Sequence, residues 1–526
     1  MHSPREGLLD GSGTTGSGPE WGTESSWSLG DLSLSQTLPK KGLNPLRWLR
    51  FIFWPRTSPE SSNKPLRPTA YLDGLRGFAA FLVYIHHHQL WAHPMNLRAA
   101  MENSFGWRDQ YFFATFYGIR TFFTGGHLAV TTFYVISGYV LTAKPLALLQ
   151  SGDYLKLGDN LASSFFRRWF RLYMPVIATT FLYVTSWHVF GVWNQVAEPK
   201  ANIGAEWSNW FVELKTFSFL FKEGPLWPSY NGHLWSIPVE MRGSIIVYIF
   251  CLALSRSTTK ARLLCMILMI IYFLYIVDGF YGALFISGML QCDLDLLYAR
   301  SAEGVGYFPG FLRRLERHKT VICYSMLLLA TYFASVPSFI DEMKVFRENP
   351  GWYYLSYLVP NAMKSPKWFF LFLSSSIIVA CSSRIWWMKR FFETRFCQYL
   401  GRISFSLYLV HGPILCTLGD RLYNAVGWLT IWDDKPRKIL GPWIDAYPLP
   451  KVGPLGLEVS FLACQLILLP FTFWLADLTT RLIDEPSVRL ASWMYKRTLG
   501  AGGGGGANGN GEPNRTEEGV PLMRIA

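Results

Sequence analysis

Charged residues are scarce in this sequence: Asp, Glu, Lys and Arg make up 16% of its 526 residues, whereas hydrophobic residues make up 50%. The apolar residues form long blocks, and two of these, residues 263–277 and 321–340, contain no charge at all. A helix needs roughly 17–25 mainly apolar residues to cross a bilayer, and only a closed backbone hydrogen-bonding pattern is stable in lipid. The blocks therefore predict membrane-spanning helices, and the lack of short alternating segments argues against a strand barrel.

Acidic residues are outnumbered, with 36 Asp and Glu against 49 Lys and Arg, which gives a net charge of +13. In a soluble protein this balance would favour nucleic-acid binding, but the sequence has no recurring basic–aromatic pattern of that kind. The basic residues cluster at the ends of the apolar blocks instead. The positive charge is therefore expected to mark the cytosolic ends of membrane spans. The expected partner is a lipid bilayer, and binding of nucleic acid is not expected.

Closely spaced cysteine pairs are also missing. None of the eight cysteines forms a Cys-x-x-Cys pair, and most lie in or beside apolar blocks. They are expected to be small buried apolar residues, and they predict neither a disulfide framework nor a zinc site.

The chain divides into four parts by composition. Residues 1–45 are rich in Ser, Gly and Pro and predict a disordered cytosolic tail without the apolar core of a signal peptide. Residues 46–70 begin with basic and aromatic side chains in a stretch too short to span, which is typical of an interfacial segment. Residues 71–490 contain the apolar blocks, and residues 491–526 include a Gly/Asn tract that predicts a second disordered cytosolic tail.

The fold class expected for residues 71–490 is an all-α polytopic membrane helix bundle with about ten transmembrane helices. By apolar length they lie near residues 74–92, 121–142, 173–193, 233–254, 262–277, 279–297, 320–338, 367–383, 399–417 and 457–482.

The orientation follows from four short basic loops, at residues 163–172, 255–262, 300–319 and 384–395. With ten spans, all four lie on the same side of the membrane as both tails. Because cytosolic loops carry the excess of Lys and Arg, both termini are expected in the cytosol. Two locations remain as alternatives, the plasma membrane and a membrane of the secretory pathway.

The first group of candidate residues lies in the first span, which begins with Tyr-Leu-Asp-Gly-Leu-Arg-Gly at residues 71–77. Asp73 is expected to cap the helix. Arg76 and His87 are eleven residues apart, about three turns and roughly 16 Å, so they share one face. An ionisable residue inside a span indicates function, although a snorkelling arginine and a structurally bonded histidine remain alternatives. Because the three successive histidines 86–88 point about 100° apart, no metal site is expected.

The second group follows Phe-Tyr-Val-Ile-Ser-Gly-Tyr at residues 133–139 and consists of Arg167, Arg168 and Arg171. If this stretch is helical, the i, i+3 and i, i+4 spacings bring the three guanidinium groups together. Their planar forks suit phosphate oxygens. The alternative is an ordinary positive-inside cluster.

The third group is His-Leu-Trp-Ser-Ile-Pro-Val-Glu at residues 233–240. His233 and Glu240 are seven residues apart and lie on roughly one face. A carboxylate at that depth needs a partner or a raised pKa, and a structural ion pair with an arginine is the alternative to a catalytic role. Pro238 is expected to kink this span.

The fourth group is Gly-Arg-Ile-Ser-Phe-Ser-Leu-Tyr-Leu-Val-His at residues 401–411. Ser404 and Ser406 suit helix packing. Tyr408 and His411 are three residues apart, and His411 is a candidate functional residue beside the simpler interpretation of packing. The last group, Arg-Leu-Ile-Asp-Glu-Pro at residues 481–486, closes the final span.

Taken together, these segments resemble the acyltransferase-3 family of integral membrane acyltransferases, with close matches in order from about residue 71 to 486. The family fold, a bundle of about ten spans, agrees with the count above. The chain departs from the family pattern in three places. The spacing selects His87 among the three histidines, Pro175 comes one residue late, and an acidic pair stands at residues 484–485 where the family has a single Glu.

The resemblance implies transfer of an acyl group, acetyl by the family's habit, from acyl-CoA to a hydroxyl of a glycan, lipid or small molecule. No bound cofactor or metal is implied, because acyl-CoA is a substrate. A multi-span transporter is the alternative, since intramembrane Arg, His and Glu also build transport paths, but the sequence shows no internal repeat.

The expected roles divide the candidates into three sets. His87 acts as general base or accepts the acyl group first, and Glu240 orients it or stabilises its charge. The remaining candidates bind acyl-CoA or the substrates: Arg76, Arg167, Arg168 and Arg171 hold the acyl-CoA, and His233, Trp235 and His411 contact substrate.

Overall fold

The structure is a computed structural model that describes residues 66–192, 194, 197–220, 228–304, 307–428 and 438–499. Within these ranges the chain is all-helical and contains no strand. The expected tail 1–45, most of the interfacial segment 46–70 and the Gly/Asn tract lie outside the described residues.

In the described part of the chain, ten long helices lie at the places of the ten expected spans. They are α2 (Ala70–Ala92), α5 (Gly126–Ser151), α6 (Tyr154–Phe190), α8 (Ser236–Ala253), α9 (Thr259–Tyr275), α10 (Phe280–Ala302), α12 (Lys319–Ala334), α14 (Pro366–Ser382), α16 (Arg395–Ile414) and α18 (Val459–Thr479). Other helices are α3 (Met95–Met101), α4 (Arg120–Thr124), α7 (Ile203–Ser218), α11 (Gly310–Leu315), α13 (Met343–Arg347), α15 (Trp386–Phe392), α17 (Asp420–Ala425) and α19 (Glu485–Thr498).

Short 3-10 and π segments extend or connect these helices. The 3-10 segments are η2 (Trp107–Asp109), η3 (Phe113–Thr115), η4 (Gly232–Trp235), η5 (Glu316–His318), η6 (Leu355–Leu358) and η8 (Lys438–Trp443). The π segments are η7 (Leu415–Gly419), which follows α16, and η9 (Thr480–Asp484), which follows α18.

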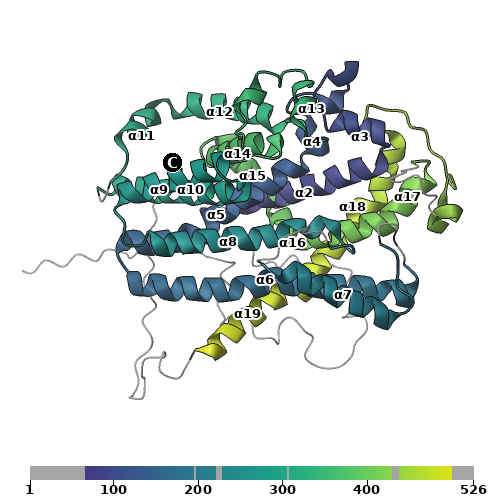
Figure 1. Cartoon of the computed structure of the whole chain (residues 1–526), viewed down its shortest axis with the longest axis horizontal. Coiled ribbons are helices and arrows are strands. Elements are labelled where there is room, and N and C mark those ends of the chain that lie inside the picture. The colour runs from purple at the N-terminus through teal and green to yellow at the C-terminus, as the bar shows by residue number, and fades with distance from the viewer. Residues whose placement is uncertain are drawn as a thin grey trace, which may run out of the picture.

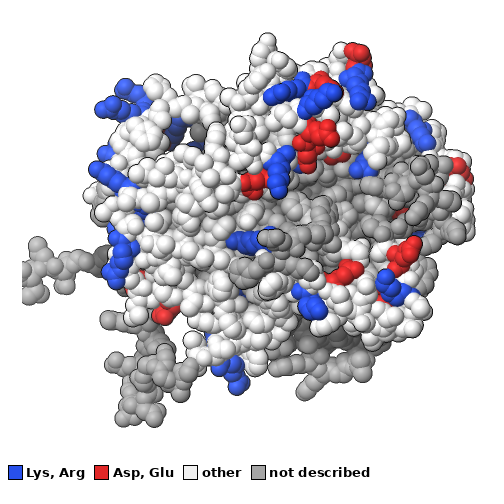
Figure 2. Space-filling view, in the orientation of Figure 1, with Lys and Arg blue, Asp and Glu red and all other residues white. Residues whose placement is uncertain are grey.

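The long helices lie side by side as a bundle, and Figure 1 shows α6, α8, α10 and α5 running along nearly the same direction. The most extensive contacts join α5 to α10 and α2 to α16. Lys and Arg side chains gather at the end of the molecule where α9 and α11 lie, whereas basic and acidic side chains mix at the end near α3 and α13 (Figure 2). This asymmetry agrees with the positive-inside interpretation, although orientation in the membrane stays a prediction.

Membrane-spanning character is clear for part of the bundle. Four helical stretches among the described residues are long and apolar enough to cross a membrane: Gly126–Ser151, Gly232–Ala253, Phe280–Ala302 and Val459–Thr498. A fifth is possible if α14 and α15, which meet at 90°, form one broken span. A helix is therefore present at each of the ten expected places, but the number of ten spans stays a prediction.

All four segments expected as basic loops are partly or wholly helical: 300–319 contains α11 and η5, 384–395 contains α15, and the other two belong to longer helices. Residues 163–172 lie inside α6, which begins early because the Asp153 side chain accepts a hydrogen bond from the Lys156 amide at 3.2 Å. In the next segment Arg262 belongs to α9 and is buried, where its Nε donates to Asp293 Oδ2 at 2.8 Å. Arg262 is thus a buried ion-pair partner rather than a loop charge.

Two further local expectations are corrected by the helix boundaries. Asp73 is no cap, because α2 begins at Ala70 and places Asp73 in its first turn, with ion pairs to Arg67 at 3.1 Å and Arg76 at 3.3 Å. Pro238 is the third residue of α8, directly after the 3-10 turn η4. A proline in the first turn costs no intrahelical hydrogen bond, so it starts the helix instead of kinking it.

Glycines let the helix backbones touch. A Cβ atom added to Gly77 of α2 would lie 2.1 Å from the amide nitrogen of Gly401 in α16. Likewise, a Cβ on Gly138 of α5 would lie 2.0 Å from the Phe285 carbonyl oxygen, and one on Gly288 of α10 would lie 2.0 Å from the Val135 oxygen. Small residues at such crossings are the usual means of close helix packing in membranes. The first contact therefore fixes how α2 and α16 lie against each other, and the other two fix α5 against α10.

We predict that Gly77→Ala destabilises the protein by about 1–3 kcal/mol, because the added methyl group must push α2 away from α16. The measurement is thermal unfolding of the full-length protein in detergent. Gly158→Ala is the matched control, since a Cβ on Gly158 in α6 would meet nothing within 4 Å. Alanine there is expected to leave stability unchanged or raise it slightly. An equal loss in both variants would contradict the packing role of Gly77.

Candidate active site

The centre of the candidate site is a hydrogen bond between histidines of α2 and α16. His411 Nε2 lies 3.2 Å from His87 Nδ1, and the two rings lie nearly parallel with centroids 5.1 Å apart. His87 is ten residues after Gly77, and His411 is ten residues after Gly401, so the two helices run parallel from the glycine contact to the histidines. That step is about 15 Å on each helix. The close glycine crossing thus sets which histidines meet.

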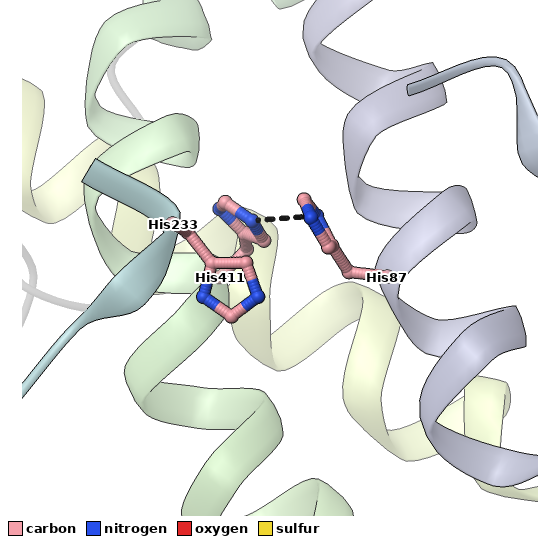
Figure 3. A group of neighbouring side chains, drawn as sticks. All are labelled: His87, His233 and His411. Carbon is pink, nitrogen blue, oxygen red and sulfur yellow. Dashed lines mark hydrogen bonds between the residues drawn. The ribbon is translucent and has the colours of Figure 1, made fainter. Parts of the chain in front are cut away.

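His233 completes a group of three imidazoles. It lies on η4, and its ring centroid is 4.2 Å from that of His87 and 5.0 Å from that of His411 (Figure 3). Its Nδ1 lies 3.3 Å from Asn231 Oδ1, and Asn231 Nδ2 donates to the Leu409 carbonyl oxygen of α16 at 3.2 Å. The expectation that His87 faces the interior of the bundle is therefore consistent with its position between two other helical segments.

Tyr408 is a residue that sequence reasoning left as packing. Its hydroxyl donates a short hydrogen bond to the His233 carbonyl oxygen and lies 2.6 Å from Ser236 Oγ. It thereby fixes η4, and with it the backbone of His233, against α16. Its spacing of three residues from His411 was the available signal, because both side chains then project toward the same neighbour.

Among the residues that the structure describes, two groups of side chains have the geometry to hold a metal ion. One nitrogen from each of His87, His233 and His411 lies within 4.8 Å of the others. The sequence argument considered only successive histidines and missed this convergence from three segments. Neutral imidazoles are common metal ligands, but both nitrogens of His411 already have hydrogen-bond partners, the Leu407 carbonyl oxygen and His87 Nδ1.

The second group is His86, Glu102 and His127, whose ligand atoms also lie within 4.8 Å of one another. The buried Arg120 donates to the Glu102 carbonyl oxygen at 2.9 Å, which places a fixed positive charge beside the group. A cation would be repelled by that guanidinium. This group therefore fits a metal ion less well than its donor atoms suggest.

Glu240 lies in a separate cluster. The Ser137 hydroxyl of α5 donates to its carboxylate at 2.5 Å, and Arg168 of α6 forms a short ion pair with it. Arg168 Nε also donates to Ser244 Oγ at 2.9 Å, and its side chain is only 8% exposed. The structural ion pair considered for Glu240 is thus formed with Arg168, whereas the ring of His87 contacts three other histidine rings.

The other arginines expected at acyl-CoA remain partly accessible. Arg76 donates from Nε to Ser404 Oγ and from a terminal nitrogen to the Gly401 carbonyl oxygen, both at 3.2 Å, and its side chain is 36% exposed. Arg167 donates to the Ser163 carbonyl oxygen of its own helix at 3.1 Å. Arg171 lies one turn further along α6 and is partly exposed. The helical spacing expected for these arginines is confirmed, and burial sets Arg168 apart from them.

Trp235 lies at the end of η4, where its ring centroid is 6.2 Å from that of Trp368 of α14. The Trp368 ring stacks in turn on Phe280 of α10 at 4.4 Å. The structure therefore places Trp235 beside other aromatic rings, near His233 in the chain. Its expected contact with substrate stays a prediction.

Comparison with known proteins gives consistent matches. The model of the acyltransferase-3 family, described as an acyltransferase domain, matches residues 69–477. The chain is 30% identical over 500 residues to the O-acetyltransferase PaAT-1 of Phomopsis amygdali, covering 88% of this chain and 91% of that protein. It is 23% identical to the acyltransferase R4 of a Phoma species, covering 63% and 77%. No solved structure matches the chain.

A bacterial relative extends the range of the matches. The putative peptidoglycan O-acetyltransferase YrhL of Bacillus subtilis is 22% identical over 384 residues, which cover 68% of this chain and 50% of that protein. The shared region therefore lies within about half of the bacterial protein.

We predict that Arg168→Met destabilises the protein by about 3–5 kcal/mol, because it leaves the Glu240 carboxylate buried without its partner. Thermal unfolding in detergent measures the effect. Combining Arg168→Met with Glu240→Met is expected to recover most of the lost stability, because no unpaired charge then remains. Arg167→Met is the neighbouring control and should cost less, since that side chain is half-buried. Equal losses in the single and double variants would contradict a coupled pair.

Proposed function

This chain belongs to the acyltransferase-3 family, and we propose that it is a membrane-embedded O-acyltransferase that moves an acetyl group from acetyl-CoA to an acceptor hydroxyl. The observation that carries the proposal is the hydrogen-bonded imidazole pair His87–His411 inside the helix bundle, with His233 against it. A neutral imidazole is the side chain best suited to accept a proton near neutral pH. The printed names of the relatives as acyltransferases and O-acetyltransferases support the reaction type.

The chemical step that we propose is direct transfer. The acceptor hydroxyl gives its proton to His87 as its oxygen attacks the thioester carbonyl, so a C–O bond forms. The C–S bond then breaks, and the CoA thiolate leaves and takes the proton from the imidazolium. Effective general-base catalysis of this kind typically contributes about 10²–10⁴-fold to the rate. A two-step route through an acyl group on His87 uses the same residue as nucleophile.

The acyl-CoA is proposed to enter from the end of the bundle that carries Arg76. Arg76 and His87 lie on one face of α2 about 16 Å apart, which leaves length for the pantetheine arm between them. Arg167 and Arg171, both partly accessible on α6, suit the phosphates. Arg168 is already bound to Glu240, so we propose that this pair holds α6 against α8 and thereby orders the neighbouring arginines.

On the far side of the histidines we propose that the acceptor binds beside His233 and Trp235. The acceptor belongs to the glycans, lipids or small molecules that carry a free hydroxyl. With both termini in the cytosol, acyl-CoA is taken from that side of a plasma or secretory-pathway membrane. A transporter is the competing class, and acetyl-CoA consumption that requires an acceptor separates the two.

We predict that His87→Ala lowers acetyl transfer by roughly 10²–10⁴-fold, because the base is lost. The assay uses purified protein in detergent with labelled acetyl-CoA and an extract of metabolites and glycans from cells that lack the protein. His88→Ala is the neighbouring control on α2, since the His88 ring is bonded instead to the Tyr423 hydroxyl at 2.7 Å. Transfer by His87→Ala at the wild-type rate would refute the role of His87, and the labelled product identifies the acceptor.

We also predict that Arg76→Gln raises the KM for acetyl-CoA by about 10–100-fold while kcat changes much less, because a charge-assisted hydrogen bond to the donor is lost. Steady-state kinetics with varied acetyl-CoA measures this. Arg67→Gln is the matched control, because Arg67 pairs with the same Asp73 from a more exposed position. An equal rise in KM for both variants would point to general surface charge instead of a specific contact.

A further inference from the structure

We infer that His411 is a positioning residue that fixes the tautomer of His87 and so presents the bare Nε2 of His87 to the acceptor hydroxyl. This inference rests on the proposed acyl transfer and changes the role expected for His411 from substrate contact to support of the base. The inference rests on the hydrogen bonds that two backbone carbonyl oxygens of α16 accept, those of Leu407 and Leu409.

The first step is the tautomer of His411. Its Nδ1 lies 3.1 Å from the carbonyl oxygen of Leu407, one turn earlier in α16. A carbonyl oxygen can only accept a hydrogen bond, so Nδ1 of His411 must carry the proton. In the neutral ring Nε2 is then unprotonated and can only accept. The ring is 1% exposed, so water does not compete for either nitrogen.

The second step transfers this constraint to His87. Nε2 of His411 accepts, so Nδ1 of His87, 3.2 Å away, must donate. The second nitrogen of the neutral His87 ring, Nε2, is therefore left with its lone pair. That is the atom that can take the acceptor proton. When it does, the imidazolium keeps its hydrogen bond to His411, which stabilises the new charge.

The third step extends the same logic to His233. Leu409 has proline at the fourth following position, Pro413, and proline has no N–H to donate to the Leu409 carbonyl oxygen. Asn231 Nδ2 donates to this oxygen instead, which fixes Asn231 Oδ1 toward His233 Nδ1. Nδ1 of His233 carries the proton for the same reason, and its Nε2 is also bare. Two bare nitrogens therefore belong to rings whose centroids are 4.2 Å apart.

This arrangement accounts for the three imidazoles without an ion. A metal bound to all three rings would need a lone pair from each, and that of His411 must come from Nε2, because Nδ1 donates to Leu407. The hydrogen bond from His87 Nδ1 to that nitrogen would then not exist. The hydrogen bond and metal coordination are thus exclusive alternatives for His411 Nε2, and they predict different metal contents.

The kinetic test compares His411→Leu with His411→Gln in the full-length protein. Leucine removes the acceptor for His87 Nδ1, so kcat should fall by about 10²–10³-fold while the KM values for acetyl-CoA and acceptor stay within about threefold. Glutamine can place its Oε1 where Nε2 of His411 stood and accept the same hydrogen bond. The kcat of the glutamine variant should therefore be at least about tenfold higher than that of the leucine variant. His88→Gln, a buried neighbour outside the three-histidine group, should keep most of the wild-type kcat.

Two kinetic outcomes would overturn the inference. A rise in the acceptor KM with kcat unchanged in both variants would return His411 to substrate binding. Equal loss of kcat in the leucine and glutamine variants, with normal folding, would show that a hydrogen-bond acceptor for His87 Nδ1 does not contribute to catalysis. Absence of acetyl transfer by the wild type would instead refute the proposed function, and the tautomer measurement below then decides the inference by itself.

The tautomer measurement needs no activity. Nitrogen-15 NMR of the histidine-labelled protein in detergent, with His87→Gln to assign the His87 signals, reports which ring nitrogen carries the proton. A proton on His87 Nδ1 supports the inference, and a proton on His87 Nε2 overturns it. Stoichiometric zinc in the purified wild type that is lost in His411→Leu would also overturn it, because those lone pairs would then belong to the metal.

Discussion

The contact on which the site depends is the backbone crossing of α2 and α16 at Gly77 and Gly401. With any larger side chain at Gly77 the two helices would separate, since its Cβ would lie 2.1 Å from the Gly401 nitrogen. Both helices continue in parallel from this crossing for ten residues, about 15 Å, and the equal steps bring His87 beside His411. The same crossing places Arg76 on the Gly401 carbonyl oxygen. One packing constraint therefore locates a cation at one end of the helix pair and two imidazoles further along it.

The interior of the bundle contains two kinds of polar group, an ion pair at Glu240 and Arg168 and a group of three histidines. Where a carboxylate is buried, as at Glu240, it is compensated by Arg168 and a serine hydroxyl, because an unpaired ion in a medium of low dielectric constant is very costly. At the proposed proton acceptor the bundle places imidazoles instead, with His411 bonded to the Leu407 carbonyl oxygen, His233 to the Asn231 side-chain oxygen and His87 to His411. A neutral cluster can be buried at much lower cost than an ion pair, and in the proposed mechanism it becomes charged only when the acceptor hydroxyl gives up its proton.

Sequence reasoning found the elements and the candidate residues but not how they meet. Long apolar blocks predicted a helix at each of the ten places, because length and hydropathy are local properties. The pairing of His87 with His411 joins residues 324 positions apart, and that of Arg168 with Glu240 joins residues 72 apart. No periodicity within one helix contains that information. The basic segment 163–172 was expected as a loop from its charge alone, yet the early start of α6 makes it helical.

The His-Gly-Pro sequence that ends α16 shows how a short motif can be explained by three separate constraints. His411 supplies a ring tied to the helix backbone. Gly412 leaves room for His233, because a Cβ there would lie 2.5 Å from His233 Nδ1. Pro413 leaves the Leu409 carbonyl oxygen without its usual helical donor, so that oxygen is open to the Asn231 amide that orients His233. Each residue type acts on a different partner, yet all three act on the same imidazole group. Replacing any one of them by an ordinary helix-forming residue would improve the helix locally and disturb the arrangement of histidines, so the motif is explained by the histidine group and not by the stability of α16 alone.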